Sequence, residues 1–416
     1  MHFCHINPCS KRRLTSTLFQ NGGHCQPIFF EYPHDPEIGH FELRNWNTLK
    51  AEIEDDNIDC EWVAQPGVRG IYSGSKFKQA KENVSIVQET TPELGRYMKF
   101  VTDRDELARY HHPKAQGAVV TSIAARVWPY KFVSHILQDL LVSSDIRGSF
   151  NLQTLTPAEK ISPTDDGRWK VTTSRGEIIT KTIALATNAY TSHLLPGFAD
   201  LIVPCRGQMS ALKPLASLAG TNRLQTSMGF EGDGLDDYLI QRPNERGGHL
   251  MFGGGRTLGH SMHVTDDSVF EEKTAAYLRR ELIDAFELPE RADEKLEMEA
   301  VRQWTGIMGF SRDELPWVGP VPGKEGVFIA AGYTGHGMPN TWLSGKAVAS
   351  MVSASLRGED GAVAVESARK STGLPRAYQV SRQRIEKAMA GDSVEARDRE
   401  EMSRGQRIKE TEQRSG

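Results

Sequence analysis

The sequence has no uninterrupted apolar run that approaches the roughly 18 residues of a membrane-spanning helix. It also has no Cys-x-x-Cys pair: its five cysteines lie at positions 4, 9, 25, 60 and 205. An odd number of scattered cysteines favours reduced thiols over a disulfide framework, and it offers no ligand set for a metal. A net charge of −4 without a basic, aromatic-rich stripe argues against nucleic acid as a partner. We therefore expect no membrane, nucleic acid or metal partner.

No signal-peptide apolar core and no terminal Ser-Lys-Leu address occur in the sequence. The first 20 residues, MHFCHINPCSKRRLTSTLFQ, are basic and free of acids, which is similar to a mitochondrial transit peptide. A mistaken gene start or a truncated copy accounts for the same residues. We expect a cytoplasmic protein, with a mitochondrial location as the alternative.

The remaining composition is that of a globular protein of two or three domains, with 416 residues, 38% hydrophobic and 25% charged. Apolar residues recur at helical spacing from Pro36, over 76–89 and after Pro129, and Asp103 is a candidate helix cap. Alternation over 148–183 predicts a small antiparallel sheet, followed by a buried strand over 182–187.

A second group of elements follows residue 200. Strands are expected over 201–212, 238–241 and 250–252, with a tight turn at 253–255. The segment 270–286 has the pattern of an amphipathic helix, for which Asp266 and Asp267 are candidate caps. Few large apolar residues occur after Val394, which predicts a solvated tail.

The segment with the most informative local pattern is 327–352. Its sequence, VFIAAGYTGHGMPNTWLSGKAVASMV, predicts a buried strand, a glycine-rich turn and a helix. Glycines at 332, 335 and 337 allow a tight turn and a close backbone approach to a ligand. Such a turn aims free N–H groups and the positive helix end at an anion or an electron-rich ring. A glycine-rich turn without any ligand is the alternative.

Five segments in chain order resemble the FAD-dependent oxidoreductases of the D-amino-acid oxidase (DAO) superfamily, which includes glycine and sarcosine oxidases. The resemblance runs from about residue 21 to 356. The segments are Asn21 to His24, Trp128 to Lys131 (WPYK), Ala186 to Ala189 (ATNA), Val203 to Gln208 (VPCRGQ), and 304–319 (WTGIMGFSRDELPWVG) with the following GYTGHGM.

The resemblance implies an α/β protein in which a Rossmann-like FAD-binding domain is joined to a mixed-sheet substrate domain. It implies a cofactor domain over 1–200, a substrate domain over 201–301, a return to the cofactor domain over 302–356, and a largely solvated extension over 357–416. The expected activity is hydride transfer from a C–N bond of a small amine or amino acid to FAD. The substrate and oligomeric state stay open.

The sequence departs from the family at its start. Members open with a strand, Gly-x-Gly-x-x-Gly and a helix, a unit that needs about 30 residues or more. Here no such motif occurs before Asn21, and the first acidic residue is Glu31. We therefore expect a cofactor domain without its first βαβ unit. A cofactor-free relative, acting as a binding protein or representing a defective gene model, is the alternative function.

The resemblance also implies site residues. Carried over to this sequence, the residues expected at the flavin are Asn21, Gly22, Gly23, His24, Ala186, Thr187, Asn188, Gly332, Gly335, His336, Gly337 and Met338. Candidates for substrate chemistry are His24, His336, Arg256, Arg302 and Tyr238. Covalent members carry a cysteine shortly before the position of Asp313, but none follows Cys205 here, so any FAD is expected to be non-covalent.

Overall fold

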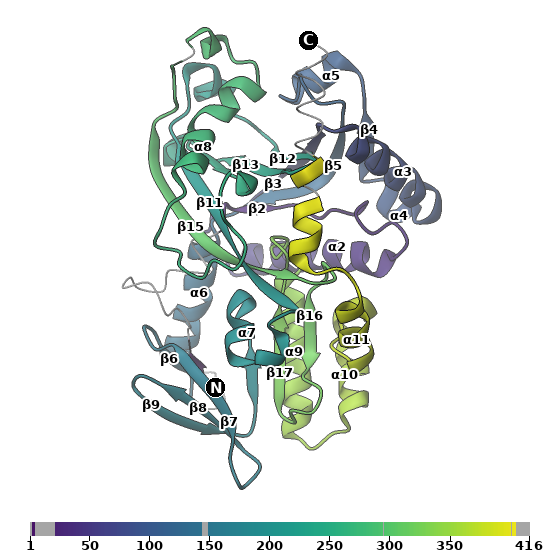
Figure 1. Cartoon of the computed structure of the whole chain (residues 1–416), viewed down its shortest axis with the longest axis vertical. Coiled ribbons are helices and arrows are strands. Elements are labelled where there is room, and N and C mark those ends of the chain that lie inside the picture. Colours follow the sequence, from purple (N-terminus) through teal and green to yellow (C-terminus); the bar gives the residue numbers. More distant parts are fainter. Residues whose placement is uncertain (1, 5–20, 144–148, 294, 401, 405–416) are drawn as a thin grey trace.

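The computed structural model describes residues 2–4, 21–143, 149–293, 295–400 and 402–404. The described residues form an elongated molecule with a large sheet in one half and three smaller sheets in the other (Figure 1). The transit-peptide-like segment lies almost entirely outside the described residues, and so does the end of the expected tail.

Within the described ranges the large sheet has nine strands, and all neighbouring strands are antiparallel except β12 and β3, which are parallel. Along its main path the order is β15 (Ala300–Ser311), β11 (Ile202–Leu212), β14 (Leu250–Gly253), β13 (Leu235–Gln241), β12 (Ser227–Gly232), β3 (Val63–Ile71), β5 (Gly117–Arg126) and β2 (His24–Cys25), with β4 (Met98–Val101) also paired to β5. The sheet thus combines strands from both sides of residue 201. The domain division expected there stays a prediction, but residue 201 does not divide the chain into two separate sheets, because strands from both sides of it pair within this one.

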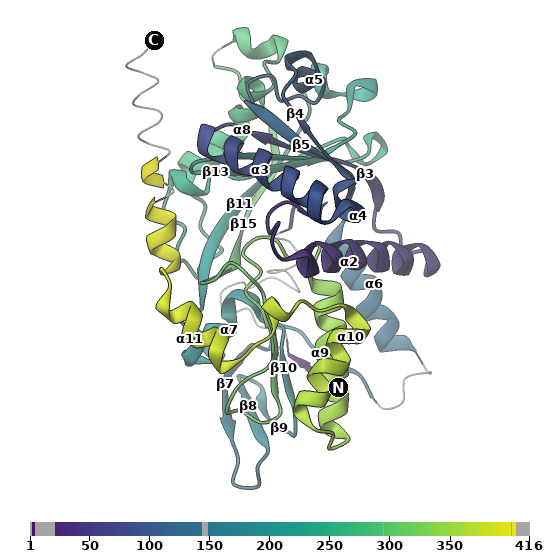
Figure 2. The same ribbon diagram turned by 90° about the vertical axis from the view of Figure 1, so that its right-hand side faces the viewer.

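The other half contains the elements expected of a cofactor domain (Figure 2). β17 (Val327–Ala331) lies between β10 (Ile183–Leu185), to which it is parallel, and β16 (Trp317–Pro320). The predicted small antiparallel sheet is present as β7 (Ala158–Pro163), β8 (Trp169–Thr173) and β9 (Gly176–Thr180). β1 (His2–Cys4) pairs in parallel with β6 (Asn151–Gln153).

Helices cover both halves. Figure 2 shows α2 crossing the middle of the molecule, where its apolar face buries Ile38, Phe41 and Leu49. The helices are α2 (Pro36–Asp55), α3 (Gly74–Thr90), α4 (Pro92–Gly95), α5 (Arg104–Arg109), α6 (Pro129–Val142), α7 (Thr191–Leu194), α8 (Glu272–Ala285), α9 (Thr341–Leu356), α10 (Gly361–Thr372) and α11 (Arg382–Ala390). Short 3-10 turns include η1 (Asn188–Tyr190) and η6 (Arg256–Leu258).

Of the two helix caps predicted from the sequence, one is present in the structure and the other is not. The Asp103 carboxylate accepts a hydrogen bond from the Glu106 N–H, so the predicted cap of α5 is confirmed. The cap predicted for α8 is wrong, because its N-cap residue is Glu271. Asp266 instead accepts the N–H of Ser268 in a local turn, which ends before the helix begins.

The expectation of a largely solvated extension is wrong for residues 361–398. Helix α10 packs on α9, and Leu374 and Tyr378 are fully buried beside it. On α11, Arg384 donates two hydrogen bonds to Asp313 and stacks on Trp317, with 3.7 Å between guanidinium and ring centre. This packing has no strong signal in the sequence, because small residues such as Ala364 and Ala368 supply the buried face of α10.

Candidate functional site

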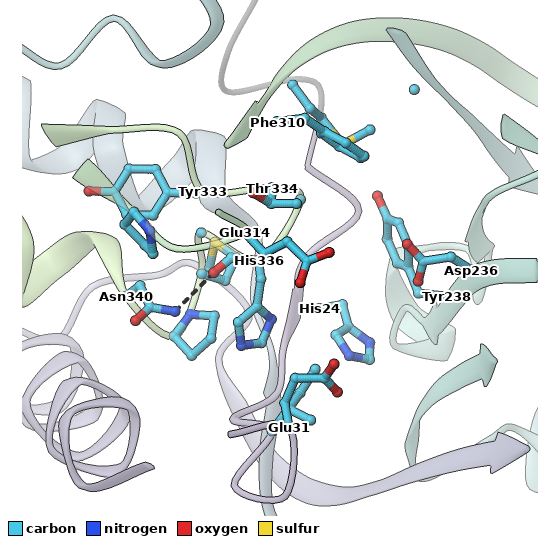
Figure 3. Close-up of a pocket in the computed structure, with 18 of the residues that line it drawn as sticks. His24, Glu31, Asp236, Tyr238, Phe310, Glu314, Tyr333, Thr334, His336 and Asn340 are labelled. Carbon is cyan, nitrogen blue, oxygen red and sulfur yellow. Dashed lines mark hydrogen bonds between the residues drawn. The ribbon is translucent and has the colours of Figure 1, made fainter. Parts of the chain in front are cut away.

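A cavity of about 620 Å³ opens where the two halves meet. Its walls come from distant parts of the chain: the loop before α2, strands β11, β13 and β15, the loop between β17 and α9, and residues 394–398. Figure 3 shows His24, Tyr238 and His336 on different sides of it. The cavity therefore exists only in the fully folded chain.

The glycine-rich turn of 332–340 forms one wall, as predicted from its strand–turn–helix pattern. Gly332 and Gly335 both have φ of +78°, a left-handed conformation that side chains with a Cβ disfavour. The backbone N–H groups of Gly335, Gly337 and Met338 have no hydrogen-bond acceptor in the described part of the chain. All three residues line the cavity, so the turn presents free donors to a ligand.

A buried carboxylate holds this turn against α2. Glu42 is 2% exposed, and its Oε1 lies 2.7 Å from His336 Nε2 and accepts the Asn340 side-chain N–H at 3.1 Å. Its Oε2 accepts the Ile28 N–H at 2.7 Å, and Tyr378 donates to Asn340. The network fixes the backbone that carries the free N–H groups. Sequence reasoning missed Glu42, although a carboxylate on the apolar face of α2 was a visible signal.

The loop Asn21 to His24 lies on the facing wall. Asn21 and His24 line the cavity, whereas Gly22 and Gly23 pack behind it against Tyr238 and the Val127 carbonyl. The Asn21 side chain accepts the Gly23 N–H at 2.7 Å, which closes the turn. Burial, with Arg69 and His336 nearby, lowers the pKa of His24 to about 3, so its ring is neutral at pH 7.

The turn at Gly23 should tolerate no side chain. Its φ is +81°, and a Cβ there would lie 2.2 Å from the Val127 carbonyl oxygen. We expect Gly23→Ala to lower the free energy of unfolding by about 2–3 kcal/mol, measured by urea denaturation. Gly220→Ala is the control, because Gly220 has φ of +60° with open space around it and should lose only about 1 kcal/mol. Equal losses would contradict the steric argument.

The third predicted cofactor segment joins the same site. Asn188 lines the cavity, and its side-chain oxygen accepts the Gly332 N–H at 3.0 Å, which ties η1 to the β17 turn. Ala186 also lines the cavity, while Thr187 and Gly332 lie outside its lining. Of the residues predicted at the flavin, those that line the cavity are Asn21, His24, Ala186, Asn188, Gly335, His336, Gly337 and Met338. Their contact with a cofactor stays a prediction.

The substrate candidates separate into two groups. Tyr238 lines the cavity beside His24, with ring centres 5.8 Å apart, and its hydroxyl lies 2.8 Å from Met209 Sδ. Arg256 also lines it, but its guanidinium is paired with the Asp398 carboxylate. Arg302 is exposed on β15, opposite Ala211, and does not line the cavity, so its predicted place in the site is wrong.

A sequence profile of the FAD dependent oxidoreductase family, DAO, matches residues 10–351. The chain belongs to this family. The predicted family and α/β fold class are thereby confirmed. DAO relatives with known sequences include the glycine oxidase of Pseudomonas aeruginosa, 32% identical over 170 residues, which is 40% of each chain. The probable oxidoreductase OrdL of Haemophilus influenzae is 25% identical over 194 residues, 45% of this chain and 39% of that protein. The alignments thus span about two fifths of these relatives.

Solved DAO-like structures share the fold. Glycine oxidase from Geobacillus kaustophilus superposes with a TM-score of 0.64 at 16% identity, covering 83% of this chain and 86% of that one. L-proline dehydrogenase from P. horikoshii gives 0.61 at 19% identity, with coverage of 87% and 90%. At these identities the likeness concerns the fold alone. In the described ranges, no helix has both the length and the apolar character to span a bilayer.

Proposed function

We propose that this DAO-family chain binds FAD non-covalently and oxidises a C–N bond of a small amine or amino acid. One observation carries the proposal: Gly335, Gly337 and Met338 line the cavity just before α9 begins, and their backbone N–H groups have no acceptor among the described residues. Free donors next to a helix N-terminus suit the electron-rich edge of a flavin ring. The family match supports the choice of cofactor.

The residues present fit a flavin ring. Gly335, Gly337 and Met338 would donate to its pyrimidine edge, while Asn21 and Asn188 would border other edges. When bound, FAD supplies the hydride acceptor for C–N oxidation. The protein supplies a pocket, and Glu42 holds the glycine-rich turn of 332–340, hereafter the donor turn, in place through His336 and Asn340.

Proton transfer in the cavity depends on which groups can accept a proton near neutral pH. With its pKa lowered to about 3, His24 is a poor base. The His336 ring is engaged with Glu42, and burial raises the pKa of Tyr238, so that its phenol stays protonated. The cavity walls shield Glu31 from bulk water, although its side chain stays accessible, and with Glu231 nearby this raises the pKa of Glu31 to about 7. Glu31 is therefore the accessible carboxylate best suited to accept a proton from a substrate ammonium.

The alternative is a cofactor-free relative that acts as a binding protein. The family match and the free donor groups do not favour it. A titration of the purified chain with FAD separates the two functions. Saturable quenching of flavin fluorescence, with flavin released intact by denaturation, is expected for non-covalent FAD binding. Absence of binding at high FAD would overturn the proposal.

A glycine pair tests the donor turn itself. Gly335→Ala forces a Cβ into a backbone of φ +78° and should displace the free N–H groups, weakening FAD binding about fivefold to tenfold. Gly358→Ala is the matched control, because Gly358 has φ of +74° with open space and lies beyond the far end of α9. The control should lose similar stability and keep its FAD affinity. Equal FAD affinity in the two variants would contradict the assigned role of the turn.

A further inference from the structure

The basic side chains of the cavity already have acidic partners. Arg69 Nη1 lies 3.2 Å from Glu231, and Lys76 lies 3.8 Å from the same carboxylate. Arg256 is paired with Asp398, and both side chains are only 14% exposed. The Nε of Arg69 has no acceptor in the described part of the chain, but Glu231 already balances the charge of this guanidinium.

The remaining cation of the cavity, Arg397, is engaged as well. It donates to the backbone carbonyls of Ser311 and Arg312, and its Nε lies 3.6 Å from Glu314. A substrate carboxylate would therefore have to displace an internal carboxylate to reach an arginine. Such an exchange contributes little binding free energy, because one ion pair of the arginine replaces another.

The acidic side chains, in contrast, outnumber their partners. Among the residues that the structure describes, seven acidic and four basic side chains line the cavity. The carboxylates of Glu31 and Asp236 are exposed, and neither has a hydrogen bond or ion pair within the described ranges. Figure 3 shows both carboxylates pointing into the open space around His24. Two accessible carboxylates in a walled cavity attract a cation more strongly than the same groups on an open surface.

A buried acceptor in the cavity lining also lacks a donor. Gln26 lines the cavity and is 4% exposed, and its Oε1 has no hydrogen-bond partner in the described part of the chain. An unsatisfied buried acceptor costs free energy until a donor reaches it. An ammonium group carries N–H donors and no acceptor, so it matches both the charge and the hydrogen-bond need of the cavity lining.

We infer that the substrate is a cationic amine without a free carboxylate, held by Glu31 and Asp236, and that Asp398 excludes carboxylates by occupying Arg256. This inference rests on the proposed function and narrows it from amines and amino acids to amines alone. Asp398 acts as a specificity-determining residue, since it neutralises the one arginine that was expected from the sequence to bind a substrate carboxylate and that lines the cavity.

Isosteric probes test the inference without turnover. tert-Butylamine, pivalate and 2-aminoisobutyrate have no hydrogen on the carbon next to nitrogen or carboxylate, so oxidation cannot consume them. Their affinities are measured by isothermal titration calorimetry on the purified chain, with and without saturating FAD. We expect tert-butylamine to bind the unmodified chain at least about tenfold more tightly than pivalate or 2-aminoisobutyrate.

Three substitutions assign the effect to residues. Glu31→Gln and Asp236→Asn should each weaken tert-butylamine about threefold to tenfold without weakening pivalate. Asp398→Asn should free Arg256 and strengthen pivalate at least about fivefold. Glu82→Gln, an exposed acid of α3 outside the cavity, is the control and should change neither affinity.

Tighter binding of pivalate or 2-aminoisobutyrate than of tert-butylamine would overturn the inference, and so would an unchanged pivalate affinity in Asp398→Asn. Failure of the cation site and failure of the proposed FAD-dependent oxidation give different results in these binding measurements and in the FAD titration. A chain that selects the amine but binds no FAD would contradict the proposed oxidation and leave the cation site standing. A chain that binds FAD but prefers carboxylates would contradict the cation site alone.

Discussion

Replacing Glu42 with alanine is expected to lower the free energy of unfolding by about 3–5 kcal/mol. The substitution removes the acceptor for the Ile28 N–H, the Asn340 amide and the His336 ring, all in a buried setting. Unpaired buried donors and a new void both destabilise the folded chain. Urea denaturation followed by tryptophan fluorescence measures the loss.

Two control variants distinguish the loss of the Glu42 hydrogen bonds from a general effect of replacing a glutamate on α2. Glu54→Ala removes the same side chain from the exposed face of α2, where the ion pair with Lys50 is open to solvent, and should change stability by less than about 0.5 kcal/mol. Glu42→Gln keeps one acceptor oxygen and should lose less than Glu42→Ala. If Glu42→Ala and Glu54→Ala behaved alike, the network would have no stabilising role. Because the network fixes the donor turn, we expect Glu42→Ala to weaken FAD binding too.

The second large effect is a fall in stability as pH rises from about 4 to about 7. Asp237 is 3% exposed, and burial raises its pKa to about 7, although it accepts hydrogen bonds from Tyr277 and the Gly255 N–H. Between the unfolded and folded pKa values the folded chain binds the proton and the unfolded chain does not. The loss of folding stability caused by Asp237 is therefore absent below about pH 4. It is complete above about pH 7, where it is on the order of 4 kcal/mol.

Asp237→Asn tests this expectation. The amide keeps the shape and one acceptor but cannot ionise, so the variant should match the unmodified chain at pH 4 and exceed its stability at pH 8. Urea denaturation at pH 4, 6 and 8 gives the comparison, and Glu82→Gln on the exposed side of α3 is the control. Parallel stability profiles for the unmodified chain and Asp237→Asn would rule out Asp237 as the cause. The raised pKa of Glu31 contributes a slope of the same sign in both chains, so it cancels in the difference.

Local patterns predicted local structure well. The strand, turn and helix of 327–352 follow from apolar periodicity and glycine spacing, which act over a few residues. The antiparallel sheet of 158–180 follows from alternation and a turn at Gly167, for the same reason.

Contacts between distant segments were not predictable in this way. Glu42 meets His336 across 294 residues and Arg256 meets Asp398 across 142, so neither pairing has a local signal. Only the position of Glu42 on an apolar helix face indicated a buried partner. The packed segment 361–398 was missed because small residues and paired arginines, not large apolar side chains, attach it to the core.

The pairing of early and late segments also sets the order in which the site can form during synthesis. β3 is parallel to β12, and the Gln65 side chain bonds to Ser227, 162 residues further on. Asp398 must then reach Arg256 before the last cavity wall is in place. A ribosome adds about 5–20 residues per second, so the early strands wait many seconds for their partners. The pocket thus stays incomplete until residue 398 has been synthesised, and the nascent chain depends on protection of its unpaired strands during that interval.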